Sequence, residues 1–184
     1  MWCVSPNKAM AELILDHMRP EHLTALSELE RLCFGPHWTA TNFRKELDNP
    51  RCRYLVSLNG SQPIAYLGYW QILEEAHITS IGVHPEFRRR RIAQLLMCRM
   101  LEDCLTHGIK WVTLEVKASN LQAQNLYQKF GFAIMGRRKN YYQAEREDAL
   151  IMWTEDVSAP DYQARLAGLI TEYQDIETQE RSIS

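Results

Sequence analysis

The chain has 184 residues, 46% of them hydrophobic, and a formal net charge of −2, which allows one hydrophobic core and gives no strong nucleic-acid or membrane signal. No apolar run approaches the roughly eighteen residues of a membrane span, and no secretion signal is visible, so we expect a cytoplasmic protein. The five cysteines include no C-x-x-C pair, so neither a disulfide framework nor a metal site is expected.

A strand and two helices are predicted in the first quarter of the chain. Leucines at helical spacing follow a proline, which is favoured at the first position of a helix. Thr39 or Thr41 is placed to cap a second helix. The predicted elements are a lead-in at 1–10, a strand at 12–18, a helix from Pro20 to about Cys33, a loop at 34–38 and a helix to about Leu47.

A hairpin and a third strand follow. Asn59-Gly60 supplies the positive φ angles that a tight turn between two strands needs. The strands of this hairpin are predicted at 53–58 and 63–72. The next strand is predicted at 76–83, where His84-Pro85 ends it.

The pattern then changes to helix followed by strand, twice. Apolar residues between Ile92 and His107 make a broad helical stripe that Gly108 ends. This alternation after an antiparallel meander indicates a mixed α/β sheet in one domain. The later predicted elements are strands at 110–117, 133–138 and 149–154, a helix at 121–130 and a loop at 139–148.

A basic turn separates the strand at 76–83 from the helix at Ile92. A helix that starts directly after a strand presents unpaired N–H groups and the positive end of its dipole, which together bind anions. Arg88–Arg91 add charge that can meet a pyrophosphate and a further phosphate. A solvated basic loop or a small nucleic-acid patch is the alternative. The strand before the turn and the helix after it favour phosphate binding.

A second group of polar residues lies in 111–132. Glu115 is the acid of an apolar strand, Asn120 is placed as a helix cap, and Tyr127 lies on the same helix face roughly 10 Å from Asn120. Acyl transfer from a thioester to an amine needs a proton acceptor and benefits from a proton donor, and Glu115 and Tyr127 are the candidates. Each also has an ordinary explanation: Glu115 as a partly exposed strand acid paired with Lys117 or an arginine, and Tyr127 as an aromatic core residue.

Two motifs together resemble the acetyl-CoA-binding half of the GNAT (GCN5-related N-acetyltransferase) superfamily. They are I-G-V-H-P-E-F-R-R-R-R-I-A at 81–93 and N-x-x-A-x-x-L-Y-x-K-x-G-F at 120–132. The resemblance implies one GNAT domain with a mostly antiparallel sheet, splayed middle strands and flanking helices. Its boundaries are expected at 1–155.

Further segments are similar to RimI-type acetyltransferases, which acetylate the N-terminal alanine of small-subunit ribosomal protein eighteen. These are F-G-P-H-W-T at 34–39, L-E-V-K-A-S-N at 114–120, K-N-Y-Y at 139–142 and E-D-A-L-I-M at 147–152. The resemblance covers roughly 12–154.

The resemblance implies roles for individual residues. Glu115 is the implied proton acceptor and Tyr127 the implied proton donor, and Tyr141 and Tyr142 are expected to line the entry of the acceptor peptide. Arg91 stands where the family has glycine, so its side chain is expected to narrow the phosphate approach, whereas Gly82 replaces a more usual alanine without expected consequence. The implied acetyl-CoA contacts are Ile81, Gly82, Val83, Arg88, Arg89, Arg90, Arg91, Ile92, Ala93, Gln94, Asn120 and Tyr127.

The predicted reaction is acetyl transfer to a protein N-terminus, with a ribosomal protein as partner. An α-amine has a pKa of about 7.7–8.0 and a lysine about 10.4, so near pH 7.4 roughly a quarter of the former is neutral against about 0.1% of the latter. The alternatives are another terminus, a lysine or a polyamine, or a non-catalytic module that binds CoA or the ribosome. A pure binding module needs neither Glu115 nor Tyr127.

The segment 156–184 is predicted to be an extension outside the GNAT domain. Leu166, Leu169, Ile170 and Tyr173 fall at i, i+3, i+4 and i+7 of one helix, which is expected to be followed by a disordered end. An isolated short helix is marginal in water, so we expect it to pack on its own domain or on a second copy, away from Glu115 and Tyr127. A frayed solvated terminus is the alternative, and we expect a monomer or a weak dimer.

Overall fold

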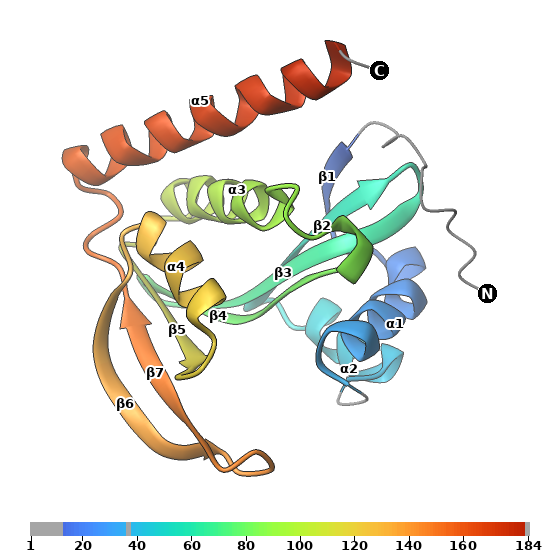
Figure 1. The fold of residues 1–184 in the computed structure, drawn as a ribbon, viewed down its shortest axis with the longest axis horizontal. Helices are drawn as coiled ribbons and strands as arrows, with labels where there is room; N and C mark the ends of the chain where they lie inside the picture. The colour runs from blue at the N-terminus through green and yellow to red at the C-terminus, as the bar shows by residue number, and fades with distance from the viewer. Residues whose placement is uncertain (1–12, 36–37, 183–184) are drawn as a thin grey trace.

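Seven strands form one sheet in the order β1-β2-β3-β4-β5-β7-β6, in which β4 and β5 are parallel and all other neighbours antiparallel (Figure 1). This computed structural model describes residues 13–35 and 38–182, so the predicted lead-in at 1–10 lies outside the described residues, as do 36–37 of the predicted loop. The strands are β1 (Leu13–His17), β2 (Cys52–Asn59), β3 (Gln62–Ile72), β4 (Glu75–Val83), β5 (Trp111–Lys117), β6 (Ala133–Tyr142) and β7 (Glu147–Trp153).

Helices cover both faces of the sheet. They are α1 (Leu23–Phe34), α2 (Ala40–Leu47), α3 (Ile92–Thr106), α4 (Leu121–Lys129) and α5 (Pro160–Ser182), with short 3-10 turns η1 (Pro20–His22) and η2 (Pro85–Phe87). On β2, Tyr54 and Val56 join the cluster beneath α1 and α2, whereas Leu55 joins the larger cluster beneath α3 and α4. Successive residues of a strand point to opposite faces, so one strand supplies both cores. The mixed α/β fold predicted from the sequence is confirmed.

The local turn and cap predictions are confirmed at two positions. Thr39 is the N-cap of α2, and its N–H donates to the Asn42 side chain at 3.0 Å. Gly60 has a φ of 62° in the turn between β2 and β3. Both features depend on residues that are close in sequence, so the sequence alone predicts them. No helix in the described ranges is long and apolar enough to cross a membrane.

A bulge on β4 opens the middle of the sheet. Gly68 of β3 pairs with Ser80 and Tyr69 pairs with Ile78, so Thr79 is an extra residue on β4. A bulge bends its strand. The parallel ladder with β5 accordingly ends at the pair Ile78 and Leu114, although β4 continues to Val83 and β5 to Lys117. The two strands therefore diverge, as the family resemblance implies.

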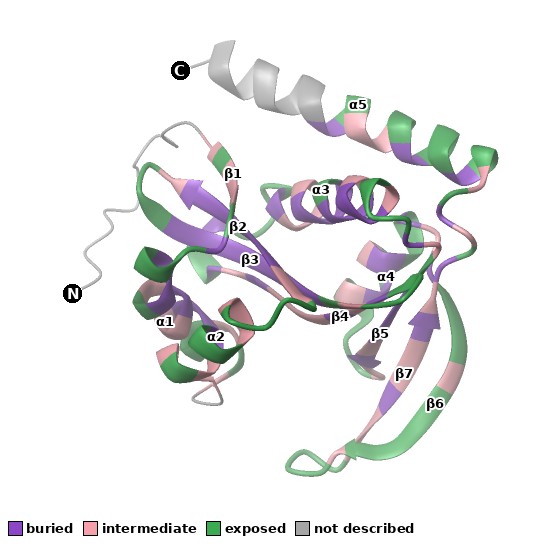
Figure 2. Ribbon diagram, turned by 180° about the vertical axis from the view of Figure 1, so that it is seen from behind, coloured by how far each residue is buried: buried purple, intermediate pink, exposed green. Residues whose placement is uncertain are grey.

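The predicted loop at 139–148 is too long. Strand β6 extends to Tyr142 and β7 begins at Glu147, which leaves a connection at 143–146. Asn140 has a positive φ of 51° and its N–H donates to Asp148 at 2.7 Å, so an irregular ladder continues past Arg138. Figure 2 shows that β6 is largely exposed. An exposed polar strand has no hydrophobic alternation, and for this reason the sequence pattern resembled a loop.

Helix α5 packs across α3 (Figure 1). Leu166 and Tyr173 are 3% and 2% exposed and belong to the main core, as does Tyr162 near the start of the helix. Its side chains are described as far as Tyr173, and its backbone continues to Ser182, beyond the predicted apolar stripe. The extension therefore lies on its own domain, which is one of the two arrangements expected.

Candidate active site

Glu115 lies on β5 at the first position past the end of the β4–β5 ladder. Its neighbours Leu114 and Val116 belong to the core beneath α3 and α4, so Glu115 points to the opposite face of the sheet. The carboxylate side chain is 8% exposed. One oxygen lies 2.6 Å from Nε2 of His77 and the other 3.2 Å from Nη1 of Arg138. Two basic side chains thus fix both oxygens where the strands diverge.

A cavity of about 330 Å³ opens on this face of the sheet, and Glu115 is part of its wall. The cavity is lined by Ile72, Glu75, His77, Thr113, Glu115, Arg138, Ile151 and Trp153. His77 and Arg138 were not selected in the sequence. The pairing of His77 with Thr113 places His77 beside Glu115, and that register is set by strand pairing rather than by any nearby motif. An acceptor amine that enters the cavity would meet a carboxylate flanked by two basic side chains.

Tyr127 lies on α4, on the other face of the sheet. It is 5% exposed and its ring centroid is 5.7 Å from that of Phe132. Its hydroxyl is protonated at neutral pH, as that of an ordinary tyrosine is, and burial raises its pKa further. Among the described residues none forms a hydrogen bond with this hydroxyl. The structure therefore places Glu115 and Tyr127 on opposite sides of the opening between β4 and β5. Tyr127 also belongs to the hydrophobic core, as its alternative explanation stated.

Asn120 caps α4, because its side-chain oxygen accepts from the N–H of Ala123 at 3.1 Å. The side-chain amide of Gln124 donates to the carbonyls of Lys117 and Ala118 at 3.2 and 3.0 Å. These bonds fix the short turn from β5 to α4. The turn holds the two elements that carry Glu115 and Tyr127 in a defined relation.

The turn before α3 presents backbone donors to one side. The N–H of Leu95 donates to the Arg91 carbonyl at 3.1 Å, whereas the N–H groups of Ile92, Ala93 and Gln94 have no partner within the described ranges. Arg89 and Arg91 have φ angles of 62° and 60°. An L-residue reaches this left-handed conformation at a cost of about 1–2 kcal/mol. The turn therefore has the shape that glycine usually supplies, with free donors at a helix start.

The four arginine side chains of this turn do not act as one patch. Arg88 donates to the Val83 carbonyl at 3.1 Å, and the Arg90 guanidinium lies 5.5 Å from the centre of the Phe87 ring. The side chain of Arg91 extends away from the turn and contacts Glu172 of α5. In the part of the chain that is described, Arg89 has no hydrogen bond, ion pair or ring contact. The Arg91 side chain is thus directed towards α5, and its expected narrowing of the phosphate approach stays a prediction.

Gly82 is not interchangeable with alanine. A Cβ at this position would lie 2.8 Å from Cε1 of Tyr66 and 3.4 Å from Sγ of Cys33. Tyr66 is completely buried and its hydroxyl is bonded to Glu30 and Ser80, so it has little room to move. Glycine is therefore the residue that fits beside Tyr66, and the expectation that it leaves the cofactor site unaffected stays a prediction.

Tyr141 and Tyr142 lie at the end of β6, with ring centroids 5.2 Å apart. Tyr141 is 46% exposed, and the guanidinium of Arg138, which contacts Glu115, lies 5.6 Å from its ring. Burial raises the pKa of Tyr142 to about 12, and the charges of Tyr141 and Glu115 add to this effect. The β6–β7 hairpin therefore brings both tyrosines to the side of the sheet on which Glu115 lies.

The chain is similar to known acetyltransferases in sequence and in fold. The sequence profile of the Acetyltransferase (GNAT) family matches residues 23–132. The ribosomal protein bS18-alanine N-acetyltransferase of Salmonella typhimurium is 33% identical over 134 residues, or 71% of this chain and 88% of that protein. A Bacillus subtilis relative named for the same activity is 39% identical over 138 residues, or 74% of this chain and 91% of its own. The crystal structure of the ribosomal-protein-S18-alanine N-acetyltransferase from Escherichia coli has a TM-score of 0.74 at 25% identity, covering 80% of this chain and 96% of that chain.

Proposed function

Because this chain belongs to the Acetyltransferase (GNAT) family, we propose that it transfers the acetyl group of acetyl-CoA to the α-amine of the N-terminal alanine of ribosomal protein bS18. One observation carries the assignment of the site. Glu115 lies where β4 and β5 diverge and faces a cavity of about 330 Å³. The two relatives named for this activity match most of their own length. The same proposal implies that the acceptor protein is a ribosomal protein and that the reaction takes place in the cytoplasm.

The residues around the opening fit acetyl-CoA. The backbone of Ile81–Val83 is paired with β3 on one edge, and on the edge towards β5 it has no strand partner among the described residues. The free N–H groups at the start of α3 suit a pyrophosphate, and Arg89 adds a positive charge beside them. Acetyl-CoA supplies the activated acetyl thioester. Asn120 and the Tyr127 hydroxyl would face it from α4.

The two ionisable groups divide the proton transfers. Glu115 takes a proton from the acceptor amine, and His77 and Arg138 orient its carboxylate. Tyr127 is protonated at neutral pH and donates its proton to the departing sulfur. One carboxylate deprotonates an α-amine, with a pKa of about 7.7–8.0, far more easily than a lysine, with a pKa of about 10.4.

The acceptor wall is proposed to comprise Tyr141 and Tyr142. A wall of this kind rejects a misfitting side chain by only about 1–3 kcal/mol per methylene, so the preference among first residues should be graded. Peptides that begin with alanine should react faster than those that begin with leucine or phenylalanine.

The test is thiol release from acetyl-CoA with a peptide from the bS18 N-terminus. The matched control is the same peptide with its terminus already acetylated and a lysine retained in the sequence. Fast release with the free alanine terminus and none with the blocked peptide is the expected result. Faster reaction at lysine would assign another amine as acceptor. No release with any amine, despite acetyl-CoA binding, would make the chain a binding module.

A further inference from the structure

We infer that α5 is a positioning element of the acetyl-CoA site and acts through Arg91; the inference rests on the proposed function. Arg91 is the N-cap of α3, in the turn that presents the free N–H groups. Its Nη1 lies 3.2 Å from a carboxylate oxygen of Glu172, and its guanidinium lies 5.9 Å from the centre of the Tyr173 ring. Both partners belong to α5. The contact spans 81 residues of sequence.

Arg91 needs such a partner for two reasons. It holds a left-handed conformation with a φ of 60° where the family resemblance expects glycine, so the backbone has no intrinsic preference for this shape. It also carries a long cationic side chain at the mouth of the anion site. An ion pair and a ring contact directed towards α5 hold that side chain outside the turn. The backbone donors of Ile92–Gln94 then stay accessible.

Helix α5 is anchored firmly enough to play this part. Tyr173 is 2% exposed and its ring centroid is 6.5 Å from that of Phe130, the residue that ends α4. The Tyr162 hydroxyl donates to the Phe130 carbonyl at 2.6 Å. The same helix therefore contacts α4, which carries Tyr127, and the turn before α3. In Figure 1, α5 runs over α3.

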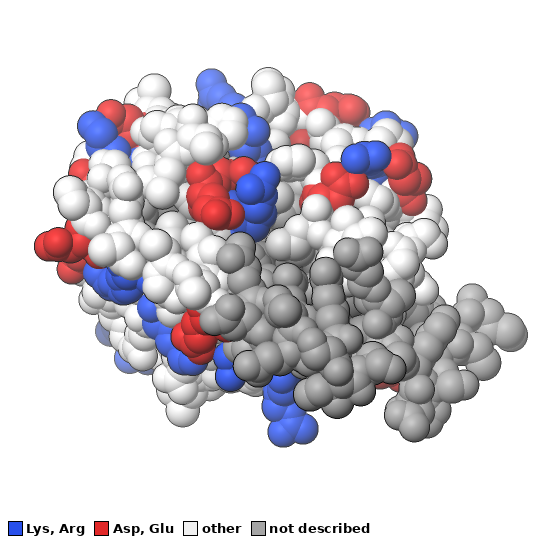
Figure 3. Space-filling model, turned by 90° about the horizontal axis from the view of Figure 1, so that it is seen from above, with Lys and Arg blue, Asp and Glu red and all other residues white. Residues whose placement is uncertain are grey.

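The surface around α5 matches this role. On the face viewed in Figure 3, acidic and basic side chains lie next to one another at several places. The side chain of Glu172 is 50% exposed. Its pairing with Arg91 is therefore accessible to substitution without opening the core.

The experiment is a double-mutant cycle of Glu172→Gln and Arg91→Gly, read by calorimetry with acetyl-CoA. Removing the Glu172 charge changes the long-range attraction of the phosphates equally in both backgrounds, so the difference between backgrounds isolates the Arg91 contact. With Arg91 present, Glu172→Gln should weaken acetyl-CoA binding by about two- to five-fold more than it does with Arg91→Gly, the range expected of an exposed ion pair. The KM for acetyl-CoA should rise by the same factor, with kcat unchanged.

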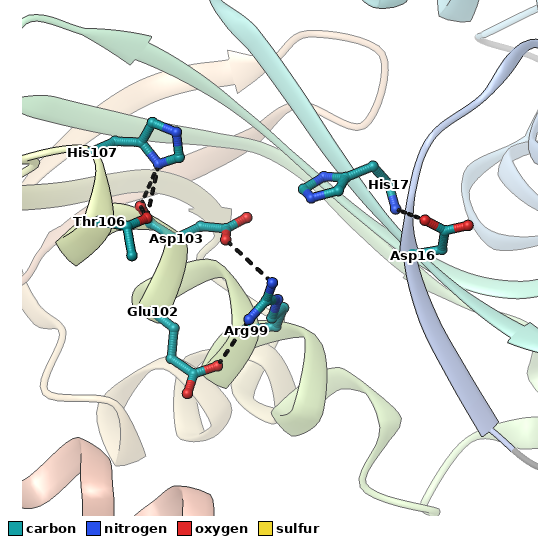
Figure 4. A network of polar contacts seen from close by, with 7 residues as sticks. All are labelled: Asp16, His17, Arg99, Glu102, Asp103, Thr106 and His107. Carbon is teal, nitrogen blue, oxygen red and sulfur yellow. Dashed lines mark hydrogen bonds and ion pairs between the residues drawn. The ribbon is translucent and has the colours of Figure 1, made fainter.

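The matched control is Glu102→Gln, which removes another exposed ion pair of α3. Arg99 Nη1 lies 3.6 Å from Glu102 in the second half of the helix (Figure 4), and the loss of this pair should leave acetyl-CoA affinity unchanged. Equal effects of Glu172→Gln in both backgrounds, or none in either, would overturn the role of α5 while the wild type still binds and acetylates. A wild type that does not bind acetyl-CoA would overturn this inference and the proposed function together.

Discussion

Replacing Glu115 with glutamine removes the proton acceptor and almost nothing else. The two side chains have nearly the same size, and the partners that lose a charged acceptor, His77 and Arg138, are 34% and 54% exposed. Water can take over their hydrogen bonds, so Glu115→Gln should lower the free energy of unfolding by only about 1 kcal/mol. For a chain of this length that corresponds to a melting temperature about 2–4 °C lower.

The effect on activity should be far larger. A positioned proton acceptor contributes about 10²–10⁴-fold, so kcat/KM for an alanine peptide should fall by that factor near neutral pH. Part of the loss should return at high pH, because the amine then loses its proton to solvent. With an amine pKa of about 7.7–8.0, the neutral fraction rises about six- to ten-fold between pH 7 and pH 9, and the rate of the variant should follow it.

The assay is thiol release at saturating acetyl-CoA across this pH range, with thermal unfolding of each variant as the check on folding. Glu75→Gln is the matched control, because Glu75 lines the same cavity without contacting Glu115. The role of Glu115 as proton acceptor is refuted if Glu115→Gln keeps near wild-type turnover at pH 7. It is equally refuted if Glu75→Gln loses as much activity, since the cavity's total charge would then matter rather than the position of one carboxylate.

Further outcomes follow from other parts of the structure. Tyr127→Phe should bind acetyl-CoA normally in calorimetry yet lose about 10²–10⁴-fold in kcat, since its hydroxyl has no hydrogen bond from the described residues. Arg89→Glu should weaken acetyl-CoA binding by about tenfold or more, an effect that added salt should reduce in the same calorimetric titration. Burial raises the pKa of Glu30 from 4.5 to about 7. The folded state therefore keeps a proton that the unfolded state loses between these values, so stability should fall by about 3 kcal/mol as pH rises from 4.5 to 7 and then level off. Urea unfolding at several pH values should show this slope in the wild type and not in Glu30→Gln. Leu166→Ala, at a site 3% exposed, should lower the free energy of unfolding by about 2–4 kcal/mol in the same assay.

Much of the chain was predictable because the signals are local. A cap at Thr39, a turn at Gly60 and the helical spacing of α3 and α4 involve residues within one or two turns of each other, and steric preference or hydrogen bonding acts at that range. The motif at 120–132 places Asn120 and Tyr127 on one helix by its spacing alone. The family resemblance depended on these same short segments, and it was sufficient to predict the fold and the chemistry.

Only the tertiary structure decided which distant groups meet. Alternation predicts the face on which a strand residue lies, but not the residue beside it, because that depends on register between strands far apart in sequence. The bulge at Thr79 and the approach of His77 and Arg138 to Glu115 both arise from such pairing. The contact of Arg91 with α5 likewise requires the packed core that seats the helix. A sequence determines its own local geometry, whereas the environment of each charged group is set by what the fold brings beside it.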